Sequence, residues 1–129
     1  KDGTIDCIAT DHAPHALEEK ECGFNCASFG MIGLESCYGA VNKILFFENN
    51  FDIVSILKLL TVNPRKIMGF ENDLFSKGKD AELVILNPKE EWNFTENNIY
   101  SKSKNSPFIG KELIGKVKYT LTKGIINKI

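Results

Sequence analysis

The run Thr-Ile-Asp-Cys-Ile-Ala-Thr at residues 4–10 leads directly into Asp-His-Ala-Pro-His at residues 11–15. The first part is short, mostly apolar and rich in β-branched residues, which is typical of a buried strand. The second part places one carboxylate and two imidazoles within five residues. Because α/β enzymes carry their chemistry just past the carboxyl ends of buried strands, this junction predicts an α/β fold with a site after residue 10.

A loop and a helix are expected after this junction. Residues 18–29 show no clear period and are followed by two nearby glycines, which predicts a long loop. Apolar residues then recur at helical spacing from Ile32 to Leu45. The pattern stops at Asn49 and Asn50, which are typical of a helix end, so one helix is expected between these limits.

Two further helices are predicted from their capping signals. Asp52 precedes an apolar set with helical spacing over residues 53–60 and is the expected N-cap of that helix. A shorter helix is expected with Asn63 as its cap, Pro64 at its first position and Gly69 just past its end.

The character of the sequence changes to β after Gly78. Residues 81–86 form a compact apolar strand that the following Asn-Pro pair is expected to end. Residues 117–126 alternate and predict a β-hairpin that turns at Lys-Gly. We therefore expect two regions: 1–70, with the last strand, a site loop and the following helices, and 71–129, a small all-β region.

Composition and charge exclude several classes of function. The chain has 129 residues, 43% of them apolar, and a formal net charge of −1, so it offers no general attraction to nucleic acid. The lysine-rich end is interpreted as the polar face of a strand, since Lys116 and Lys118 alternate with apolar residues. No apolar run could span a bilayer and no signal peptide opens the sequence. The prediction is a cytoplasmic protein that binds neither nucleic acid nor membrane.

Four cysteines, at positions 7, 22, 26 and 37, leave two interpretations open. Free thiols in a reducing compartment are favoured, because nothing indicates secretion. A small module with four thiolates around a metal ion is the alternative, although the spacing lacks the Cys-x-x-Cys pairs of zinc ribbons.

The Asp-His-Ala-Pro-His run also has two interpretations. Asp11 could be a metal ligand or a general base, and His12 and His15 could bind metal, transfer protons or hold an anion. The alternative is a hydrogen-bonded turn in which Asp11 satisfies backbone amides ahead of Pro14. The spacing of these residues does not decide between the two.

Segments along nearly the whole chain resemble the carboxyl-terminal part of class I bacterial-type dihydroorotases, which belong to the amidohydrolase superfamily. They are ATDHAPH (9–15), ASFGMIGLE (27–35), TVNPRKIMGF (61–70), GKDAELVILNP (78–88), SKSKNSPFIGKELIGKV (101–117) and TLTKG (120–124). The resemblance implies the terminal part of a (β/α)₈ barrel followed by part of a small β-sandwich-like domain. A complete barrel needs roughly 250 residues, so the chain is expected to hold only a part of it.

The resemblance also implies a reaction and roles for particular residues. The family interconverts N-carbamoyl-L-aspartate and dihydroorotate in pyrimidine biosynthesis, with zinc as the cofactor. Asp11 matches the carboxylate that binds metal and transfers the proton, and His15 matches the histidine that holds the substrate carboxylate. His12 is expected to orient the loop. The backbone of Ser28-Phe29-Gly30 matches the loop that contacts the substrate ring, with Ser28 where proline is usual; simple packing of Phe29 under the loop is the alternative.

Most of the family's metal ligands are absent from this chain. The resemblance implies a His-x-His, a carboxylated lysine and two further histidines, whereas the chain has no histidines besides His12 and His15. We therefore expect the chain alone to be inactive and to need the rest of the barrel as partner, with a homodimer as a further possibility. The alternative function is a non-catalytic scaffold subunit that partners aspartate transcarbamoylase.

Overall fold

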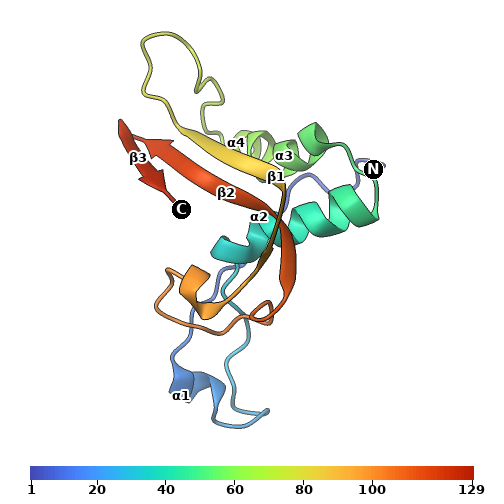
Figure 1. The fold of residues 1–129 in the computed structure, drawn as a ribbon, viewed down its shortest axis with the longest axis vertical. Coiled ribbons are helices and arrows are strands. Elements are labelled where there is room, and N and C mark those ends of the chain that lie inside the picture. Colours follow the sequence, from blue (N-terminus) through green and yellow to red (C-terminus); the bar gives the residue numbers. More distant parts are fainter.

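A three-stranded antiparallel sheet forms one layer of the computed structural model, which describes residues 1–129 (Figure 1). Its strands are β1 (Leu83–Asn93), β2 (Glu112–Thr122) and β3 (Ile125–Lys128), in the order β1-β2-β3. The predicted hairpin at Lys123-Gly124 is confirmed: both residues have positive φ, 48° and 74°, as a two-residue turn of matching twist requires. β2 begins at Glu112, earlier than the alternation indicated.

β1 is longer than the predicted strand. It does not end at the Asn-Pro pair but continues through Pro88 to Asn93. Its pairing with β2 is irregular between Asn87 and Glu91, and Pro88, which has no N–H to give to the ladder, lies in this irregular part. The Asn42 side chain donates a 2.9 Å hydrogen bond to the Pro88 carbonyl, so a helix residue supports the irregularity.

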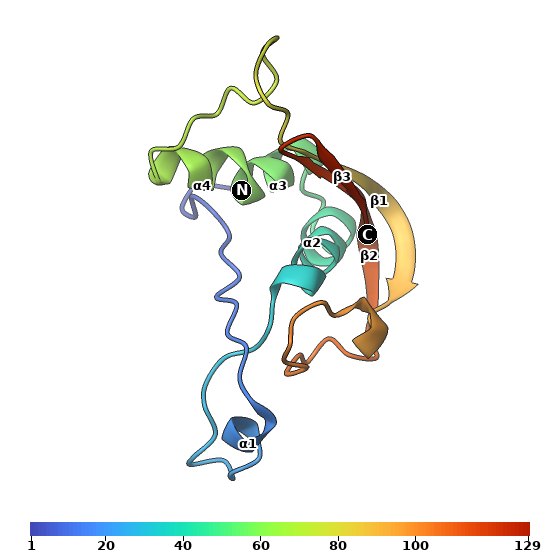
Figure 2. The same ribbon diagram turned by 90° about the vertical axis from the view of Figure 1, so that its left-hand side faces the viewer.

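The predicted helix that follows Ile32 is present and crosses one face of the sheet (Figure 2). α2 (Leu34–Asn42) continues into a π-helical turn, η1 (Lys43–Glu48), which the sequence did not indicate. The predicted end of this helical stretch at Asn49 and Asn50 is confirmed. The Asn49 side chain donates to the Ile44 carbonyl at 2.7 Å, and Asn50 has a positive φ of 52°.

α3 (Ile53–Leu60) has the predicted cap, because the Asp52 carboxylate accepts a 2.9 Å hydrogen bond from the Ser55 N–H. The prediction for α4 (Val62–Ile67) is wrong at its start: the helix begins one residue before Asn63. The Asn63 side chain instead donates to the Asp6 carbonyl at 2.8 Å. None of the helices combines the length and apolar content needed to cross a membrane.

The core lies between α2 and the sheet. α2 approaches β2 closely: a Cβ on Gly39 would lie 3.0 Å from the Leu113 side chain, and one on Gly115 would lie 2.7 Å from the Asn42 amide. Asn42 is fully buried and also donates to the Ile114 carbonyl. The buried apolar cluster consists of Ile32, Ala40, Phe94, Ile99 and Leu113. On the sheet, Lys118 of β2 forms an ion pair with Glu90 of β1 at 2.9 Å.

The predicted buried strand at residues 4–10 is not formed. These residues are extended but have no neighbouring strand to pair with, and a strand needs such a partner for its ladder. Ile5 is accordingly 70% exposed. One backbone hydrogen bond, from the Ile8 N–H to the Leu59 carbonyl at 3.0 Å, holds the segment against α3.

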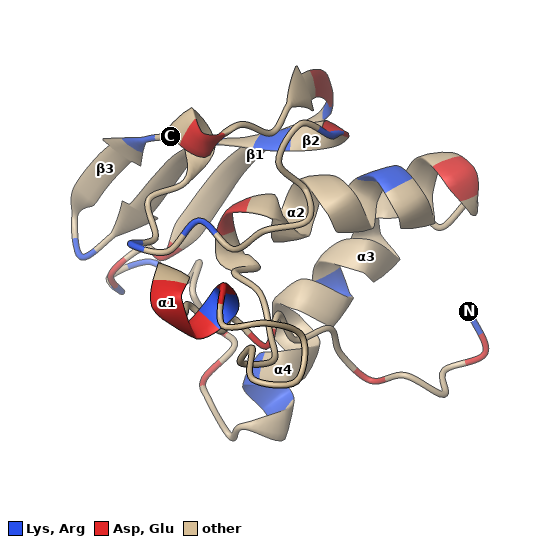
Figure 3. Cartoon of the chain, turned by 90° about the horizontal axis from the view of Figure 1, so that it is seen from below, with Lys and Arg blue, Asp and Glu red and all other residues tan.

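Residues 1–31 run away from the packed part of the chain and return to it, as Figure 2 shows. At the far end of this excursion lies α1 (Leu17–Lys20), a single helical turn that overlaps the start of the loop predicted at residues 18–29. The turn carries charges of both signs, from Glu18, Glu19 and Lys20 (Figure 3). The Glu19 carboxylate accepts a 2.9 Å hydrogen bond from the Ala16 N–H, which stabilises the start of the turn.

Candidate active site

Asp11 follows the extended segment 4–10, and its side chain has no partner within the chain. It has a positive φ of 44°, which is uncommon for a residue other than glycine and less costly for Asp than for most. Its side chain is exposed and makes no hydrogen bond or ion pair within the chain. The interpretation of Asp11 as a carboxylate that satisfies backbone amides in a turn is therefore wrong. Strained backbone with a free functional group is a feature of active sites.

His12 is engaged in positioning the chain. Its Nδ1 accepts a 3.1 Å hydrogen bond from the Gly33 N–H, so the ring proton is on Nε2 in the neutral form. That nitrogen lies 3.5 Å from the Ser101 hydroxyl, which donates to Glu35 at 2.6 Å. This geometry agrees with the prediction that His12 orients the loop, and it ties residue 12 to both α2 and the 101–105 segment.

Glu35 is the acidic end of this hydrogen-bond chain. Burial alone would raise its pKa, but hydrogen bonds from the hydroxyl and the backbone N–H of Ser101 outweigh that effect, and the pKa lies below its ordinary value. Glu35 is therefore ionised and a constant acceptor at neutral pH.

His15 faces the loop that the resemblance associates with the substrate ring. Its Nε2 lies 2.8 Å from the Phe29 carbonyl, and since a carbonyl only accepts, this nitrogen is the donor. The other ring nitrogen lies 3.5 Å from the Glu19 carboxylate. His15 and Ser28–Gly30, both matched by the resemblance to substrate contacts, thus lie together, and their roles toward a substrate stay predictions.

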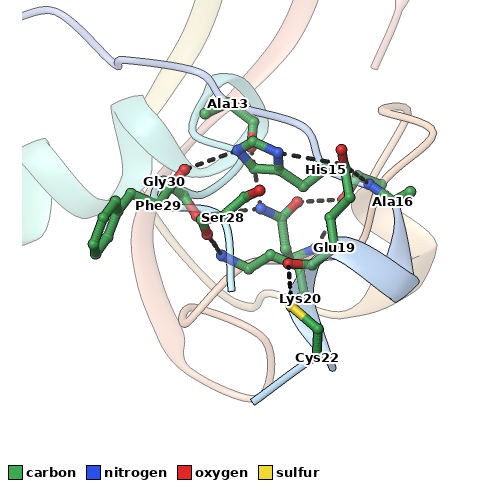
Figure 4. Close-up of polar contacts among 11 residues, drawn as sticks. Ala13, His15, Ala16, Glu19, Lys20, Cys22, Ser28, Phe29 and Gly30 are labelled. Atoms are coloured by element: carbon green, nitrogen blue, oxygen red, sulfur yellow. Dashed lines mark hydrogen bonds and ion pairs between the residues drawn. The ribbon is translucent and has the colours of Figure 1, made fainter. Parts of the chain in front are cut away.

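The three carbonyls of Ser28–Gly30 all accept hydrogen bonds from side chains (Figure 4). Lys20 donates to the Ser28 carbonyl at 2.6 Å and to the Gly30 carbonyl at 3.0 Å. The Asn105 amide donates to the Gly30 carbonyl at 3.3 Å and to the Ala13 carbonyl at 3.1 Å. We call Lys20, His15 and Asn105, with the carbonyls that they hold, the loop clasp.

The Phe29 ring points away from the loop clasp and is 95% exposed, so the interpretation that it packs under the loop is wrong in this chain. Gly30 can be nothing larger: its φ is +105°, and a Cβ there would lie 2.6 Å from the Ala13 Cβ. The loop therefore lies directly against the Asp11–His15 run.

Lys20 and Asn105 were not singled out as site residues from the sequence. Lys20 lies in a segment without periodicity, and a side chain that binds backbone carbonyls leaves no spacing pattern to find. Asn105 belongs to a segment that carries the resemblance, but no role was assigned to it. Both residues line a cleft of about 780 Å³ between α1 and the 101–105 segment, together with His12 and His15. Asp11 does not line this cleft.

The chain by itself does not fit a zinc site. No group of three or more His, Cys, Asp or Glu side chains is placed to hold a metal ion, whereas catalytic zinc generally has three protein ligands. Asp11 is the one residue of the chain that the resemblance matches to a family metal ligand, and this role stays a prediction. All four cysteines are free, and they do not gather around a common point, so the thiolate-metal module is excluded for this structure.

Comparison with known proteins identifies dihydroorotases as relatives. The dihydroorotase of Caldicellulosiruptor saccharolyticus is 46% identical over 128 residues, which are 99% of this chain and 30% of that protein. The dihydroorotase of Chlorobaculum tepidum is 47% identical over 116 residues, 90% of this chain and 26% of that protein. The chain thus spans less than a third of the length of these relatives and matches their carboxyl-terminal part. No family model matches the chain.

Solved structures establish the fold. L-hydantoinase (dihydropyrimidinase) from Arthrobacter aurescens superposes with a TM-score of 0.81 over 94% of this chain and 28% of its own, at 24% identity. D-hydantoinase (dihydropyrimidinase) from Thermus sp. gives a TM-score of 0.78 over 96% of this chain and 28% of its own, at 21% identity. Hydantoinases are amidohydrolase (β/α)₈ barrels, so the predicted fold class, terminal barrel part plus small β region, is confirmed.

Proposed function

We propose that this chain, which corresponds in sequence to the carboxyl-terminal part of dihydroorotases, supplies one side of the active site of a cyclic amide hydrolase. The proposed reaction is the interconversion of N-carbamoyl-L-aspartate and dihydroorotate. The observation that carries the proposal is the arrangement of the Asp11–His15 run, with an unpaired carboxylate on strained backbone and the Ser28–Gly30 loop fastened beside it.

Asp11 is proposed as the catalytic carboxylate. It is exposed and has no partner within the chain, so its oxygens are free to accept a proton and to return it to a departing ring nitrogen. The left-handed φ of Asp11 fixes the direction in which the carboxylate leaves the extended segment. A side chain with these properties suits a general base whose substrate is not part of this chain.

His15 is proposed to hold the substrate carboxylate. Its Nε2 proton is committed to the Phe29 carbonyl, which leaves Nδ1 as the nitrogen that can change partner. In the protonated ring, Nδ1–H can turn from Glu19, 3.5 Å away, to a substrate carboxylate. The backbone of Ser28, Phe29 and Gly30 is proposed to contact the substrate ring.

The remaining parts of the site are proposed to come from the rest of the barrel. Residues 4–10 have no neighbouring strand and none of them is buried, as expected of a barrel strand whose neighbours lie outside this chain. Zinc, when bound, would polarise the amide carbonyl, and Asp11 would be the one ligand given by this chain. We further propose that the complete protein acts in the cytoplasm and forms a homodimer.

An assay of the complete protein tests this function. Dihydroorotate should be hydrolysed and N-carbamoyl-L-aspartate cyclised, while hydantoin, which lacks the carboxylate for His15, should be a poor substrate. The isolated 129-residue chain should show neither activity, because it holds no group of three metal-ligating side chains. Absence of turnover of dihydroorotate by the metal-loaded complete protein would refute the proposal.

The second candidate is a dihydroorotase-like scaffold that binds aspartate transcarbamoylase without catalysis. A scaffold has no need of the free Asp11 carboxylate, so Asp11 favours the enzyme. Size-exclusion chromatography of the complete protein with aspartate transcarbamoylase, alongside the assay, separates the two. A stable complex without turnover supports the scaffold, and turnover supports the enzyme.

A further inference from the structure

The peptide groups of the Ser28–Gly30 loop have a defined orientation. The carbonyls of Ser28 and Phe29 point toward Lys20 and His15, which hold them at 2.6 and 2.8 Å. In a planar trans peptide the N–H of the next residue points the opposite way. The N–H groups of Phe29 and Gly30 therefore point away from the loop clasp.

These two N–H groups are available for a ligand. Neither the Phe29 nor the Gly30 N–H donates a hydrogen bond within the chain. The preceding N–H, of Ser28, is in contrast bonded to the Glu19 carbonyl at 2.9 Å. The loop thus presents two successive backbone donors, and their direction depends on what holds the carbonyls behind them.

We infer that Lys20 is a positioning residue, whose ammonium sets the direction of the Phe29 and Gly30 N–H groups toward the substrate ring. The inference rests on the function proposed above and adds a residue to it. One ammonium bridges the carbonyls on both sides of Phe29, at 2.6 and 3.0 Å, and its three N–H donors allow it to bind both at once. Lys20 is half-buried and is the last residue of α1, so its own backbone is fixed.

The other members of the loop clasp cannot replace Lys20. His15 binds only the Phe29 carbonyl. The Asn105 amide donates to the Gly30 carbonyl at 3.3 Å and also to the Ala13 carbonyl. The Ser28 carbonyl has Lys20 as its only side-chain donor. Without the ammonium, the peptide group that carries the Phe29 N–H is free to rotate.

Steady-state kinetics of the complete protein with dihydroorotate test this inference. Lys20→Met should raise KM about tenfold and leave kcat within about threefold, since loop donors that bind the ring equally in ground and transition states affect binding alone. Lys20→Arg should recover part of the loss, because a guanidinium can also bridge two carbonyls. The matched control is Lys102→Met: Lys102 borders the same cleft but donates no hydrogen bond within the chain, and its KM should be unchanged.

A second measurement does not depend on activity. Phe29 is 95% exposed and a site for chymotrypsin, and cleavage there requires the loop to open. Lys20→Met should speed this cleavage about tenfold, as expected when a charge-assisted hydrogen bond is lost, and Lys102→Met should not. Any one of three results would overturn the role of Lys20. They are an unchanged KM and cleavage rate in Lys20→Met, no recovery in Lys20→Arg, and an equal effect of Lys102→Met.

A wild-type protein that does not turn over dihydroorotate would instead refute the proposed function. The cleavage rates would then decide the role of Lys20 by themselves.

Discussion

The packed part of the chain and residues 1–31 are held in place by different interactions. Every buried residue lies at or after Ile32, and apolar contacts between α2 and the sheet dominate there. Residues 1–31 contain no buried residue and are attached to the packed part through hydrogen bonds, among them those from Asn105 to the Ala13 carbonyl, from Asn63 to the Asp6 carbonyl and from the Ile8 N–H to the Leu59 carbonyl. The residues with candidate chemistry thus lie on the part of the chain that apolar burial does not stabilise.

The energies of the two kinds of contact differ accordingly. Burial of one large apolar side chain contributes about 1.5–3 kcal/mol, whereas one hydrogen bond contributes about 0.5–1.5 kcal/mol net. Changes in the packed part should therefore alter global stability. Changes in the Asp11–Gly30 region should alter the site and have a smaller effect on global stability.

Replacement of Phe94 by alanine should show the largest effect on stability. Phe94 is fully buried and packs edge-on against Trp92 with ring centroids 5.8 Å apart. Its loss should reduce the free energy of unfolding by about 3–5 kcal/mol, seen as a lower urea midpoint of the complete protein. Phe29→Ala is the matched control: this ring is 95% exposed, and the change should stay within about 0.5 kcal/mol. Equal losses for the two variants would remove the distinction between the two regions.

Much of the packed part could be predicted because its signals are local. The Asp52 cap, the asparagines after η1 and the Lys123-Gly124 turn each act within a few residues, and all three are present. The continuation of β1 past Pro88 was missed because it depends on Asn42, which is distant in sequence. Local rules do not include such a contact.

The candidate site was predictable in its residue types but not in its connections. The resemblance matched His15 and Ser28–Gly30 to contacts with the same substrate, and in the structure the His15 ring lies 2.8 Å from the Phe29 carbonyl. The strand at residues 4–10 failed because strand formation needs a partner, which propensity alone cannot supply. The role of Lys20 could not be predicted, because hydrogen bonds to backbone carbonyls impose no residue pattern on the sequence.

Gly30→Ala should disturb the site with a smaller effect on stability. The substitution adds a Cβ 2.6 Å from that of Ala13, on a backbone with φ of +105°, at a cost of about 1–3 kcal/mol. We expect KM for dihydroorotate to rise about tenfold or more and chymotrypsin cleavage at Phe29 to accelerate. Gly23→Ala is the control, since Gly23 also has positive φ, +90°, but no atom within 4 Å. If both variants raise KM equally, backbone strain rather than contact with Ala13 explains the effect.

Glu35→Gln should have the smallest effect, and one that depends on pH. The pKa of Glu35 in the folded chain lies below its ordinary value of 4.5, so the ionised carboxylate stabilises the fold above that pH. This contribution is lost as the pH falls below 4.5 through the folded pKa. Melting temperatures at pH 7, 5, 4 and 3 should show wild type above Glu35→Gln at pH 7 and 5, with the difference shrinking at pH 4 and 3. A difference that is constant over this range would argue against the hydrogen bonds from Ser101 as its cause.

The role of Asp11 is tested most directly by the turnover number of the complete protein with dihydroorotate, for wild type and Asp11→Asn. The substitution keeps the size of the side chain and removes its ability to accept a proton. We expect kcat to fall by at least about a hundredfold, the range for loss of a general acid–base group, with an unchanged melting temperature. His15→Ala should instead raise KM with a smaller effect on kcat. Near-normal kcat in Asp11→Asn would show that the carboxylate at the end of the extended segment is not the catalytic group.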